Sequence, residues 1–510
     1  MSRILLTISL LCVFPLFGQT DINDRYHGEY LPMNYRSKIE NSEAYFKEES
    51  TLHSSVLPVL GFRNTELQSP LMLNKTVKEK GIFQLFPIAN LNAAYEIGSA
   101  GGFFTNTGIG IGMNLSTSKF IFQLNTLPYY SVGNSLQDSI QSNYNQDFGT
   151  QRAIAPSFFH QSELRLAYKP NHIFTFSGGV AKNWFGEGYR SMLLSDNAAA
   201  HPFVKIETDF AGIKYVNLYQ AWKDNTTDPF NSALDIQKFA SSHYISWNIT
   251  KSINLSVFET VVWQTSDTLV NRGFDVNYIN PIVFYRPVEY GLGSSDNVLI
   301  GLNTSYKINN HHQIYGQFIL DEFLLSAIQD QSKWWANKFG GQIGYKSNAF
   351  FHDSVYFQIE FNAARPFTYS HRNSQHAYGH LNASVAHPIG ANFFELVNIV
   401  SYRSNKHRLT NKITFASYGI DPSDTLSYGQ DIFKSYTLRD GNYGHLMMQG
   451  VRQNVLNENL IYEYALLENI GLFLTANYNW RMINSTAGTA HQHFISVGIK
   501  SRIWNVYNDF

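Results

Sequence analysis

The stretch Val355–Ala363, VYFQIEFNA, alternates strictly between two kinds of side chain. One face carries Val355, Phe357, Ile359, Phe361 and Ala363, and the other carries Tyr356, Gln358, Glu360 and Asn362. Successive side chains of a strand point to opposite faces, so the pattern predicts one mostly apolar and one polar face. A tilted strand needs roughly 9–11 residues to cross a bilayer. The stretch therefore predicts a barrel strand with its apolar face toward lipid and its polar face toward a lumen.

The same alternation recurs along the chain, for example at 203–210, 298–308 and 470–480. Counting each alternating run once from residue 82 onward gives about eighteen strands. Short turns are expected at 115–119, 250–253 and 307–312, and long connections at 131–158, 223–242, 264–296, 365–392 and 419–456. Short turns at one rim and long loops at the other are typical of outer-membrane barrels. We therefore predict an all-β, transmembrane antiparallel barrel over residues 81–510.

The composition agrees with a barrel. Aromatic residues make up 15% of the chain, with 38 Phe and 31 Tyr, and charged residues only 15%. A typical soluble domain has about a quarter charged residues. Beyond the amino-terminal region no apolar run is long enough to predict a transmembrane helix. The formal net charge of −1 gives no electrostatic basis for binding nucleic acid.

The amino-terminal residues 1–19 are predicted to be a secretory signal peptide. Arg3 supplies the positive charge, and an apolar run at 4–17 precedes Gly18 and Gln19. Cys12, the only cysteine, lies within this signal, so disulfides and thiol chemistry are excluded from the mature chain. Residues 20–80 are more polar, with a short helix expected at 41–49. They are interpreted as a periplasmic extension or a plug, and a disordered tether is an open alternative.

The chain ends HQHFISVGIKSRIWNVYNDF, residues 491–510. Ile495, Val497, Ile499 and Ile503 alternate with Ser496, Gly498, Lys500 and Arg502. We expect a last amphipathic strand that ends in the aromatic Phe510 and resembles the sorting signal of outer-membrane barrels. The alternative is the edge strand of a soluble sheet. Together with the signal peptide, the pattern predicts a heat-modifiable protein in the outer membrane, in contact with its lipids.

Residues 183–208, NWFGEGYRSMLLSDNAAAHPFVKIET, lie between two predicted strands. This stretch gathers polar and aromatic residues around two glycines, Gly186 and Gly188: Trp184, Glu187, Tyr189, Arg190, Asp196, Asn197 and His201. Irregular polar backbone is tolerated at membrane depth only inside protein or beside water. We predict that the loop folds into the lumen and plugs it. An ordinary connection between strands is the alternative.

A second polar stretch, residues 278–303, holds Arg286, Glu289 and Asp296 beside Tyr285 and Tyr290. Aromatic faces and planar polar groups suit a sugar. An ion-pair network in the lumen that supports the barrel is the favoured alternative, and the two readings stay open. An Arg that faces lipid at the midplane costs about 2–4 kcal/mol. The charged residues should therefore face the lumen or the loops, where opposite charges would pair.

Three other groups of residues are interpreted as structural rather than catalytic or metal-binding. Asp321 and Glu322 are neighbours on a predicted strand and should face opposite sides, which argues against a glycosidase pair. Trp334 and Trp335 are expected in the interfacial aromatic belt. Four histidines occur at His371, His376, His380 and His387, without acidic partners at ligand spacing, so no metal site is predicted. No common catalytic motif occurs, and we expect no enzyme activity, no catalytic residue and no cofactor.

Several stretches resemble known families. WFGEGYRSMLLSDNAAAHP, residues 184–202, is similar to the central motif of the Wzi-type capsule-assembly barrels. The resemblance to the RemB-type gliding-motility proteins of Bacteroidetes rests on INPIVFYRPVEYGLGSSDN, YGQFILDEF, WWANKFGGQIGYK and HPIGANFFE, at residues 279–297, 315–323, 334–346 and 387–395. Together these resemblances cover roughly residues 80–510.

The resemblance implies a plugged outer-membrane barrel that acts at the cell surface and is not an enzyme. It implies surface polysaccharide as a partner, and possible contacts with gliding or capsule-export proteins. Two other functions stay open: a channel for a small substrate, and a barrel enzyme that modifies lipid or glycan. A plug counts against the channel, and the lack of a catalytic motif counts against the enzyme.

Overall fold

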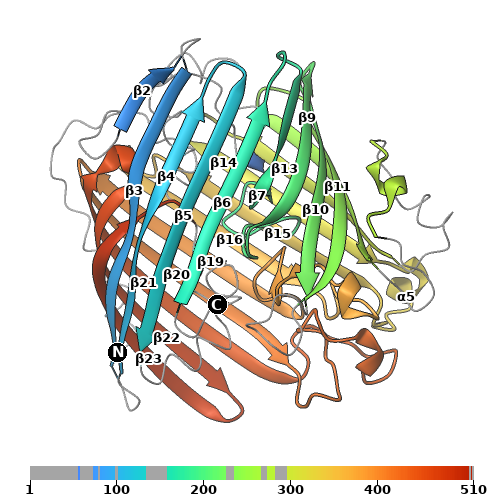
Figure 1. Ribbon diagram of the computed structural model, residues 1–510. Coiled ribbons are helices and arrows are strands. Elements are labelled where there is room, and N and C mark those ends of the chain that lie inside the picture. Colours follow the sequence, from blue (N-terminus) through green and yellow to red (C-terminus); the bar gives the residue numbers. More distant parts are fainter. Residues whose placement is uncertain are drawn as a thin grey trace.

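The computed structural model describes residues 55–57, 73–77, 81–97, 102–133, 158–224, 235–265, 273–281, 296–504 and 507. These residues form an 18-strand closed antiparallel β-barrel, which confirms the predicted fold class (Figure 1). Among them, no helix is long and apolar enough to pass through a bilayer. The predicted signal peptide and the helix expected at 41–49 lie outside the described residues.

The first half of the wall comprises β3 (Gly81–Ile97), β4 (Gly102–Ser116), β5 (Phe120–Gly133), β6 (Phe158–Tyr168), β7 (Phe174–Ala181), β9 (His201–Phe210), β10 (Ile213–Asp224), β11 (Ile236–Asn248) and β12 (Ile253–Gln264). The second half comprises β13 (Asn297–Lys307), β14 (His312–Glu322), β15 (Lys338–Ser347), β16 (Val355–Ala364), β19 (Phe393–Ser404), β20 (His407–Ile420), β21 (Val451–Leu467), β22 (Leu472–Ser485) and β23 (Gly488–Ser501). Each strand pairs with its neighbours, and β23 closes the ring on β3 from His493↔Ile97 to Lys500↔Asn90.

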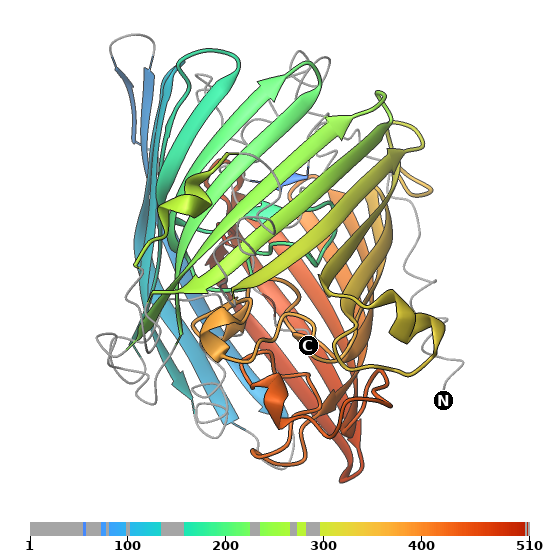
Figure 2. The ribbon, with the colours of Figure 1, turned by 90° about the vertical axis from the view of Figure 1, so that its right-hand side faces the viewer.

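The connections differ between the two rims of the barrel (Figure 2). Residues 117–119, 211–212, 249–252, 308–311 and 405–406 form short turns at one rim, which we call the short-turn rim. Residues 323–337, 365–392 and 421–450 form long connections at the other, the long-loop rim. They contain α5 (Leu325–Gln329), η4 (Ser374–His376), β17 (Gly379–His380), β18 (Ala383–Ser384) and η5 (Tyr436–Leu438). The predicted turns at 115–119, 250–253 and 307–312 are confirmed.

The two faces of each strand differ as the alternation predicts. On β9, Val204 points outward with 56% of its surface exposed, while its neighbours Phe203 and Lys205 are buried inside. On β16, Ile359 and Phe361 are exposed, and Gln358, Glu360 and Asn362 are buried. Apolar side chains therefore cover the outer wall, as lipid requires, and polar side chains line the interior.

Parts of the amino-terminal region also belong to the folded structure. β2 (Leu73–Val77) forms a hairpin with β3, so barrel-associated structure begins before the predicted start at 81. β1 (Val56–Leu57) pairs with β8 (Trp184–Phe185), a short strand in the connection between β7 and β9. Residues 56 and 57 therefore contact the connection between β7 and β9, and the role of 20–80 as an extension or plug stays a prediction.

The carboxyl terminus differs from the predicted last strand. β23 ends at Ser501, and Arg502 donates from its backbone to Gly471 and forms an ion pair with Glu463. Ile503 is not a strand residue but packs in a buried cluster with Phe86. Residues 502–504 therefore do not continue the wall, and the predicted aromatic end, Phe510, lies outside the described residues.

Candidate functional site

The connection between β7 and β9, residues 182–200, crosses the interior of the barrel and is buried along most of its length. The Phe185 ring stacks on Tyr244 of β11, with 4.5 Å between the ring centroids. Met192, Leu193 and Leu194 lie in the main buried cluster, which also contains side chains of β10–β14 and of the 365–392 connection. The predicted lumenal loop is therefore a packed plug.

Gly186 shows why glycine is needed in the plug. Its φ of +134° lies in a region that other residues rarely adopt. An added Cβ would stand 2.1 Å from Nε2 of Gln317 on β14. The Gln317 side chain in turn accepts from the backbone N–H of Met192, at 2.7 Å. The glycine thus lets the plug backbone approach the wall closely enough to bond with it.

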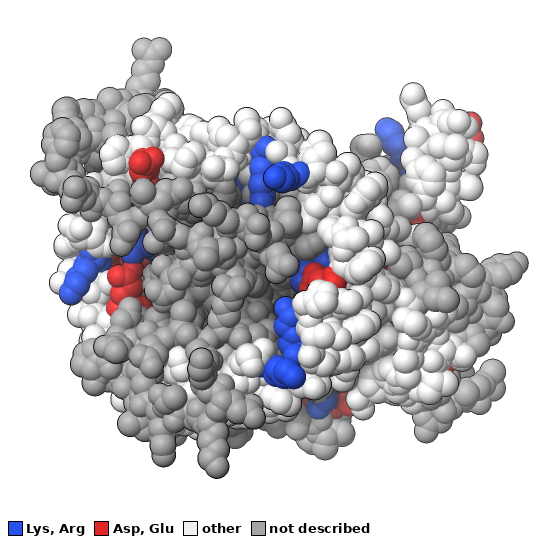
Figure 3. Space-filling model, turned by 90° about the horizontal axis from the view of Figure 1, so that it is seen from above, with Lys and Arg blue, Asp and Glu red and all other residues white. Residues whose placement is uncertain are grey.

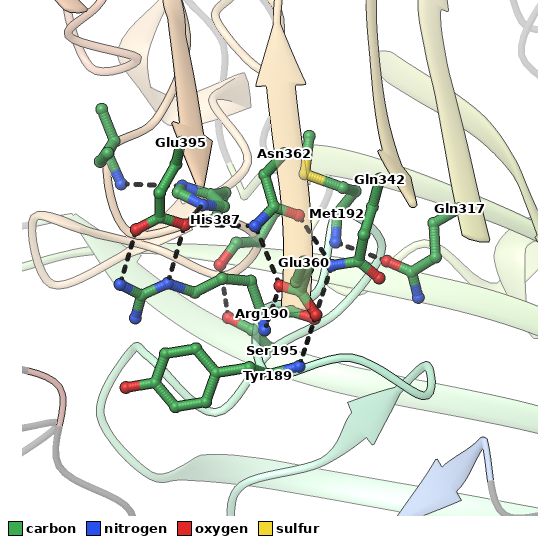
Figure 4. A network of polar contacts seen from close by, with 12 residues as sticks. Tyr189, Arg190, Met192, Ser195, Gln317, Gln342, Glu360, Asn362, His387 and Glu395 are labelled. Carbon is green, nitrogen blue, oxygen red and sulfur yellow. Dashed lines mark hydrogen bonds and ion pairs between the residues drawn. The ribbon is translucent and has the colours of Figure 1, made fainter. Parts of the chain in front are cut away.

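The Glu360 side chain of β16 binds the backbone of the plug (Figure 4). Its carboxylate accepts from the backbone N–H groups of Tyr189, at 2.7 Å, and Arg190, at 3.0 Å. The Tyr315 hydroxyl donates to the same carboxylate at 2.7 Å, and Asn362 donates at 2.9 Å. One inward-facing side chain therefore fixes two consecutive residues of the plug.

Glu395 of β19 holds the plug by a side chain. The Arg190 guanidinium donates to both oxygens of Glu395, from Nη2 at 2.8 Å and from Nε at 3.2 Å (Figure 4). His387 Nε2 lies 2.8 Å from the same carboxylate, and Asn362 donates at 3.2 Å. All four side chains are buried. Removing one partner of such a pair strongly destabilises the folded protein, because the other charge stays buried without its counter-charge.

Further contacts spread the attachment over several strands. Lys346 Nζ of β15 lies 3.3 Å from the Glu187 carboxylate, and Lys412 of β20 donates to the Tyr189 hydroxyl at 2.9 Å. At the far end, Ser195 Oγ donates to the Ala386 carbonyl. We call Glu187, Tyr189, Arg190 and their partners Lys346, Glu360, Glu395 and Lys412 the lumenal latch.

A residue from the carboxyl-terminal segment also reaches the plug. The Tyr507 hydroxyl donates to Asp196 at 2.6 Å, and its ring lies edge-on to Tyr189, with 5.6 Å between centroids. The Arg190 guanidinium lies 5.1 Å from the Tyr507 ring centroid. Tyr507 therefore adds a contact from the end of the chain to the plug.

The remaining plug residues singled out from the sequence are buried as well. Trp184 donates to the Gly186 carbonyl, Asn197 donates to the Ser384 carbonyl, and His201 lies 2.8 Å from Gln220. All three side chains are thus buried and bonded within the protein. Which of these residues act in function stays a prediction.

Of the charged residues singled out in the second polar stretch, only Asp296 lies within the described residues. Arg286 and Glu289 lie outside the described residues. Asp296 is described, and its carboxylate accepts from the Tyr278 hydroxyl at 2.6 Å. Tyr278 packs against Trp263 and Val298, which point outward from β12 and β13. Asp296 therefore lies on the outer side of the wall, not in the lumen, because the described segment 273–281 that it contacts lies there.

Sequence reasoning missed the wall partners of the plug: Gln317, Gln342, Lys346, Glu360, Asn362, Glu395 and Lys412. Glu360 and Asn362 belong to the polar face predicted at 355–363, so their inward direction was foreseeable. The pairing of particular wall residues with the plug depends on the closed barrel, which brings residues more than a hundred positions apart into contact, and no local pattern encodes it.

Asp321 and Glu322 differ from the expected arrangement. The pairing of β14 with β15 shifts register between Leu320 and Glu322. Lys338 Nζ lies 2.9 Å from Asp321 and 3.5 Å from Glu322, so both carboxylates reach one ammonium group. The bulge cancels the strict alternation that placed them on opposite faces. Asp321 is nevertheless buried and also accepts from the Tyr369 backbone, which fits a structural ion pair.

The four histidines do not gather at one point. His371 and His376 lie with their Nδ1 atoms 3.2 Å apart, His380 accepts from the Lys223 backbone, and His387 bonds to Glu395. Within the described part of the chain, no group of three or more potential ligands is arranged to hold a metal ion.

The 365–392 connection should be sensitive to acid. Burial, with repulsion from His376, Lys338 and Arg372, lowers the pKa of His371 from 6.5 to about 3. Between pH values of about 3 and 6.5, His371 takes up a proton only when the connection has left its native position. The stabilisation by neutral, buried His371 is therefore present above about pH 6.5 and is lost as the pH falls. We expect lower amide protection factors across 365–392 near pH 5 than near pH 7. His371→Asn should reduce this difference, and an equal difference in that variant would contradict the assignment.

Charges at the short-turn rim are mixed. Seen from that end, acidic and basic side chains adjoin at more than one place, and most other visible described atoms are neither (Figure 3). Ion pairs also occur on the inner faces of β9 and β10, where the Lys214 and Lys205 ammonium groups lie 3.3 Å and 2.5 Å from the Glu207 carboxylate. Pairing of this kind suits a supported interior more than a steering field of one sign.

Comparisons with known proteins give fold likenesses only. No protein-family model matches the chain, and no curated protein matches it. Wzi, a carbohydrate-binding outer-membrane barrel involved in group 1 capsule assembly in Escherichia coli, is 12% identical with a TM-score of 0.49, over 81% of this chain and 84% of that one. OprD of Pseudomonas aeruginosa is 10% identical with a TM-score of 0.43, over 84% and 96%. OccAB2 of Acinetobacter baumannii is 8% identical with a TM-score of 0.44, over 83% and 98%. At such values the likenesses carry no argument about what this chain binds.

Proposed function

We propose that this chain is a non-enzymatic outer-membrane protein that holds or helps to assemble surface polysaccharide, and through it supports gliding motility. The observation that carries the proposal is the latch across the lumen. A barrel of this size has room for an aqueous channel, but here Glu360 and Glu395 bind a buried segment within it. A segment packed and bonded across the lumen supports a role at the surface more than passage of a small substrate.

The long-loop rim offers the chemistry that a polysaccharide needs. Trp334, Trp335 and Tyr436 come together there from two connections, with 6.2 Å between the two tryptophan centroids and 4.6 Å between Trp335 and Tyr436. All three rings are partly exposed, and Tyr443 nearby in sequence is 66% exposed. We call these four residues the rim aromatics. Partly exposed rings can pack against the C–H faces of sugars.

Two arginines at the same rim add hydrogen-bond donors. The Arg439 guanidinium lies 4.1 Å from the Trp335 ring centroid and donates to Asn442, and Arg365 donates to the Asn337 carbonyl at 2.7 Å. Arg439 also donates to the Tyr436 carbonyl at 3.0 Å, and the Arg365 guanidinium lies 5.5 Å from the Phe339 ring centroid. Their charge is thus held in place by neutral groups and is available to the hydroxyls or acidic groups of a glycan.

The direct test removes exposed rings at this rim. Tyr443→Ala and Trp334→Ala should each weaken binding of surface polysaccharide, purified from the producing cells, by about two- to tenfold, the range expected for an aromatic contact. Phe351→Ala is the matched control, because Phe351 is 95% exposed but lies in the short turn between β15 and β16. Equal binding by all variants would count against the rim as the contact.

Deleting the gene tests the proposal as a whole. The expected result is loss of retained surface polysaccharide and reduced spreading, restored by the wild-type gene. Unchanged polysaccharide retention and gliding in the deletion strain would refute the proposal. A folded protein that conducts ions in a planar bilayer without any change to the plug would instead support the channel.

A further inference from the structure

The connection between β12 and β13 does not stay at the long-loop rim. Its described part, residues 273–281 with η3 (Val276–Ile279), lies outside the barrel beside β10 and β11 (Figures 1 and 2, yellow-green). It begins near the rim end of β12, where Gly273 donates to the Thr265 carbonyl. It ends with Pro281 beside Tyr215, close to the β9–β10 turn. The segment therefore runs along the outer wall toward the short-turn rim.

The wall beneath the segment is polar although it points outward. Residues paired across neighbouring strands face the same side of a sheet. Tyr219 pairs with Val204, which is exposed on the outer wall, and also with Ser241. By the same register His243 lies between Asn217 and Glu259, one step along this face. We call Tyr215, Asn217, Tyr219, Ser241, His243 and Glu259 the outer-wall patch.

The outer-wall patch is hidden from the surroundings. Asn217, Ser241, His243 and Glu259 are buried, whereas outward residues elsewhere on the wall, such as Val204 and Leu302, are exposed. His243 Nδ1 lies 3.7 Å from Glu259 Oε2. Polar and ionisable side chains in contact with lipid are costly and seldom occur without a function. Their presence on this face calls for a polar occupant.

The backbone of the segment provides that occupant. Ser241 donates to the Tyr278 carbonyl at 2.8 Å, and Tyr219 donates to the Ile279 carbonyl at 2.9 Å. His243 Nε2 lies 3.0 Å from the Asn280 carbonyl, and the Tyr215 hydroxyl donates to the Pro281 carbonyl. Four consecutive carbonyls thus find partners on the wall. Irregular backbone at membrane depth needs such partners, because lipid supplies none.

The two faces of the segment suit this position. Tyr278 points to the wall, where its ring lies 4.8 Å from that of Trp263 and its hydroxyl reaches Asp296. Phe274, Val276 and Ile279 are exposed on the segment, and Val276 reaches 70%. The segment therefore covers a polar patch and shows three apolar side chains in its place, while the exposed Asn277 bonds to Asp275 within the segment.

We propose that the outer-wall patch is an intramembrane binding site for irregular peptide backbone, and that its occupant is this chain's own segment 273–281. Segment 273–281 is then a strap embedded in the lipid-facing side of the barrel, not part of an extracellular loop. The site is independent of the polysaccharide role and of the latch, because it lies on the opposite face of the wall.

A spin label at Val276 tests the position of the strap. The full chain with Cys12→Ser and Val276→Cys, placed in lipid nanodiscs, should show high collision rates with oxygen and low rates with a water-soluble nickel chelate. The ratio should match that of Val204→Cys, on the outer wall, and exceed that of Tyr443→Cys, on the long-loop rim. A ratio for Val276→Cys equal to that of Tyr443→Cys would overturn the proposal.

A second experiment tests the patch as the binding partner. In the labelled protein, Tyr219→Phe and Ser241→Ala each remove one donor to the strap. Each should shift the equilibrium toward the released strap by about fivefold, the value of one ordinary hydrogen bond, and raise collision with the nickel chelate. Ser242→Ala is the matched control, because Ser242 is equally buried but faces inward and bonds to Thr260. Unchanged collision rates in both donor variants, with heat-modifiable folding retained, would refute the role of the patch.

Discussion

Replacing Glu395 by alanine is expected to lower the free energy of unfolding by about 3–5 kcal/mol, the cost of breaking a buried ion pair. The change removes the carboxylate that accepts from Arg190, His387 and Asn362 and leaves the Arg190 guanidinium buried in the plug. Thermal and urea unfolding of the detergent-solubilised protein would measure the loss, with the mobility of unheated samples on gels as the readout of the folded barrel.

The matched control is a second glutamate–arginine pair. Glu468 of the β21–β22 turn contacts Arg403, and both side chains are about one-third exposed. Exposed pairs contribute about 0–1 kcal/mol, so Glu468→Ala should change stability little. Equal losses of stability in the two variants would mean that the buried Glu395–Arg190 pair stabilises the protein no more than an exposed pair does.

The wall of the barrel was predictable because each strand carries its own evidence. The alternation at 355–363 fixes which side chains point inward from local sequence alone, and the structure places Gln358, Glu360 and Asn362 in the interior as expected. Turn positions such as 307–312 were foreseeable for the same reason. Because lipid surrounds the barrel and its interior is polar, every strand follows one rule: apolar side chains point outward and polar side chains point inward.

The partners of the plug were not predictable, because they depend on ring closure. Arg190 lies more than two hundred positions from Glu395, and the sequence near either one gives no hint of the other. The strap was missed for a related reason. Ser241 and His243 look like ordinary polar strand residues, and only the register with Val204 shows that they face outward. The end of β23 at Ser501 was missed because alternation continues in the sequence beyond the last paired residue.

Removing the plug is expected to open the barrel. A variant in which residues 186–198 are replaced by a short glycine–serine linker loses the backbone that Glu360 binds and the guanidinium that Glu395 binds. The freed polar side chains of Gln317, Lys346 and Glu360 would then be solvated by water, which gives the interior the character of an aqueous channel. Planar-bilayer recordings should show little conductance from the intact protein and a large, steady conductance from the deletion variant.

The same recordings separate a fixed plug from a movable one. If the latch holds the segment permanently, the intact protein stays closed at every applied voltage, and Glu395→Ala adds brief openings without a steady pore, since Glu360 still binds the backbone of Tyr189 and Arg190. A steady pore in the intact protein would contradict the plug. A deletion variant that is folded and heat-modifiable but conducts no better than the intact protein would show that residues 186–198 do not close the lumen. The surface-polysaccharide proposal would then lose the observation that favours it over a channel.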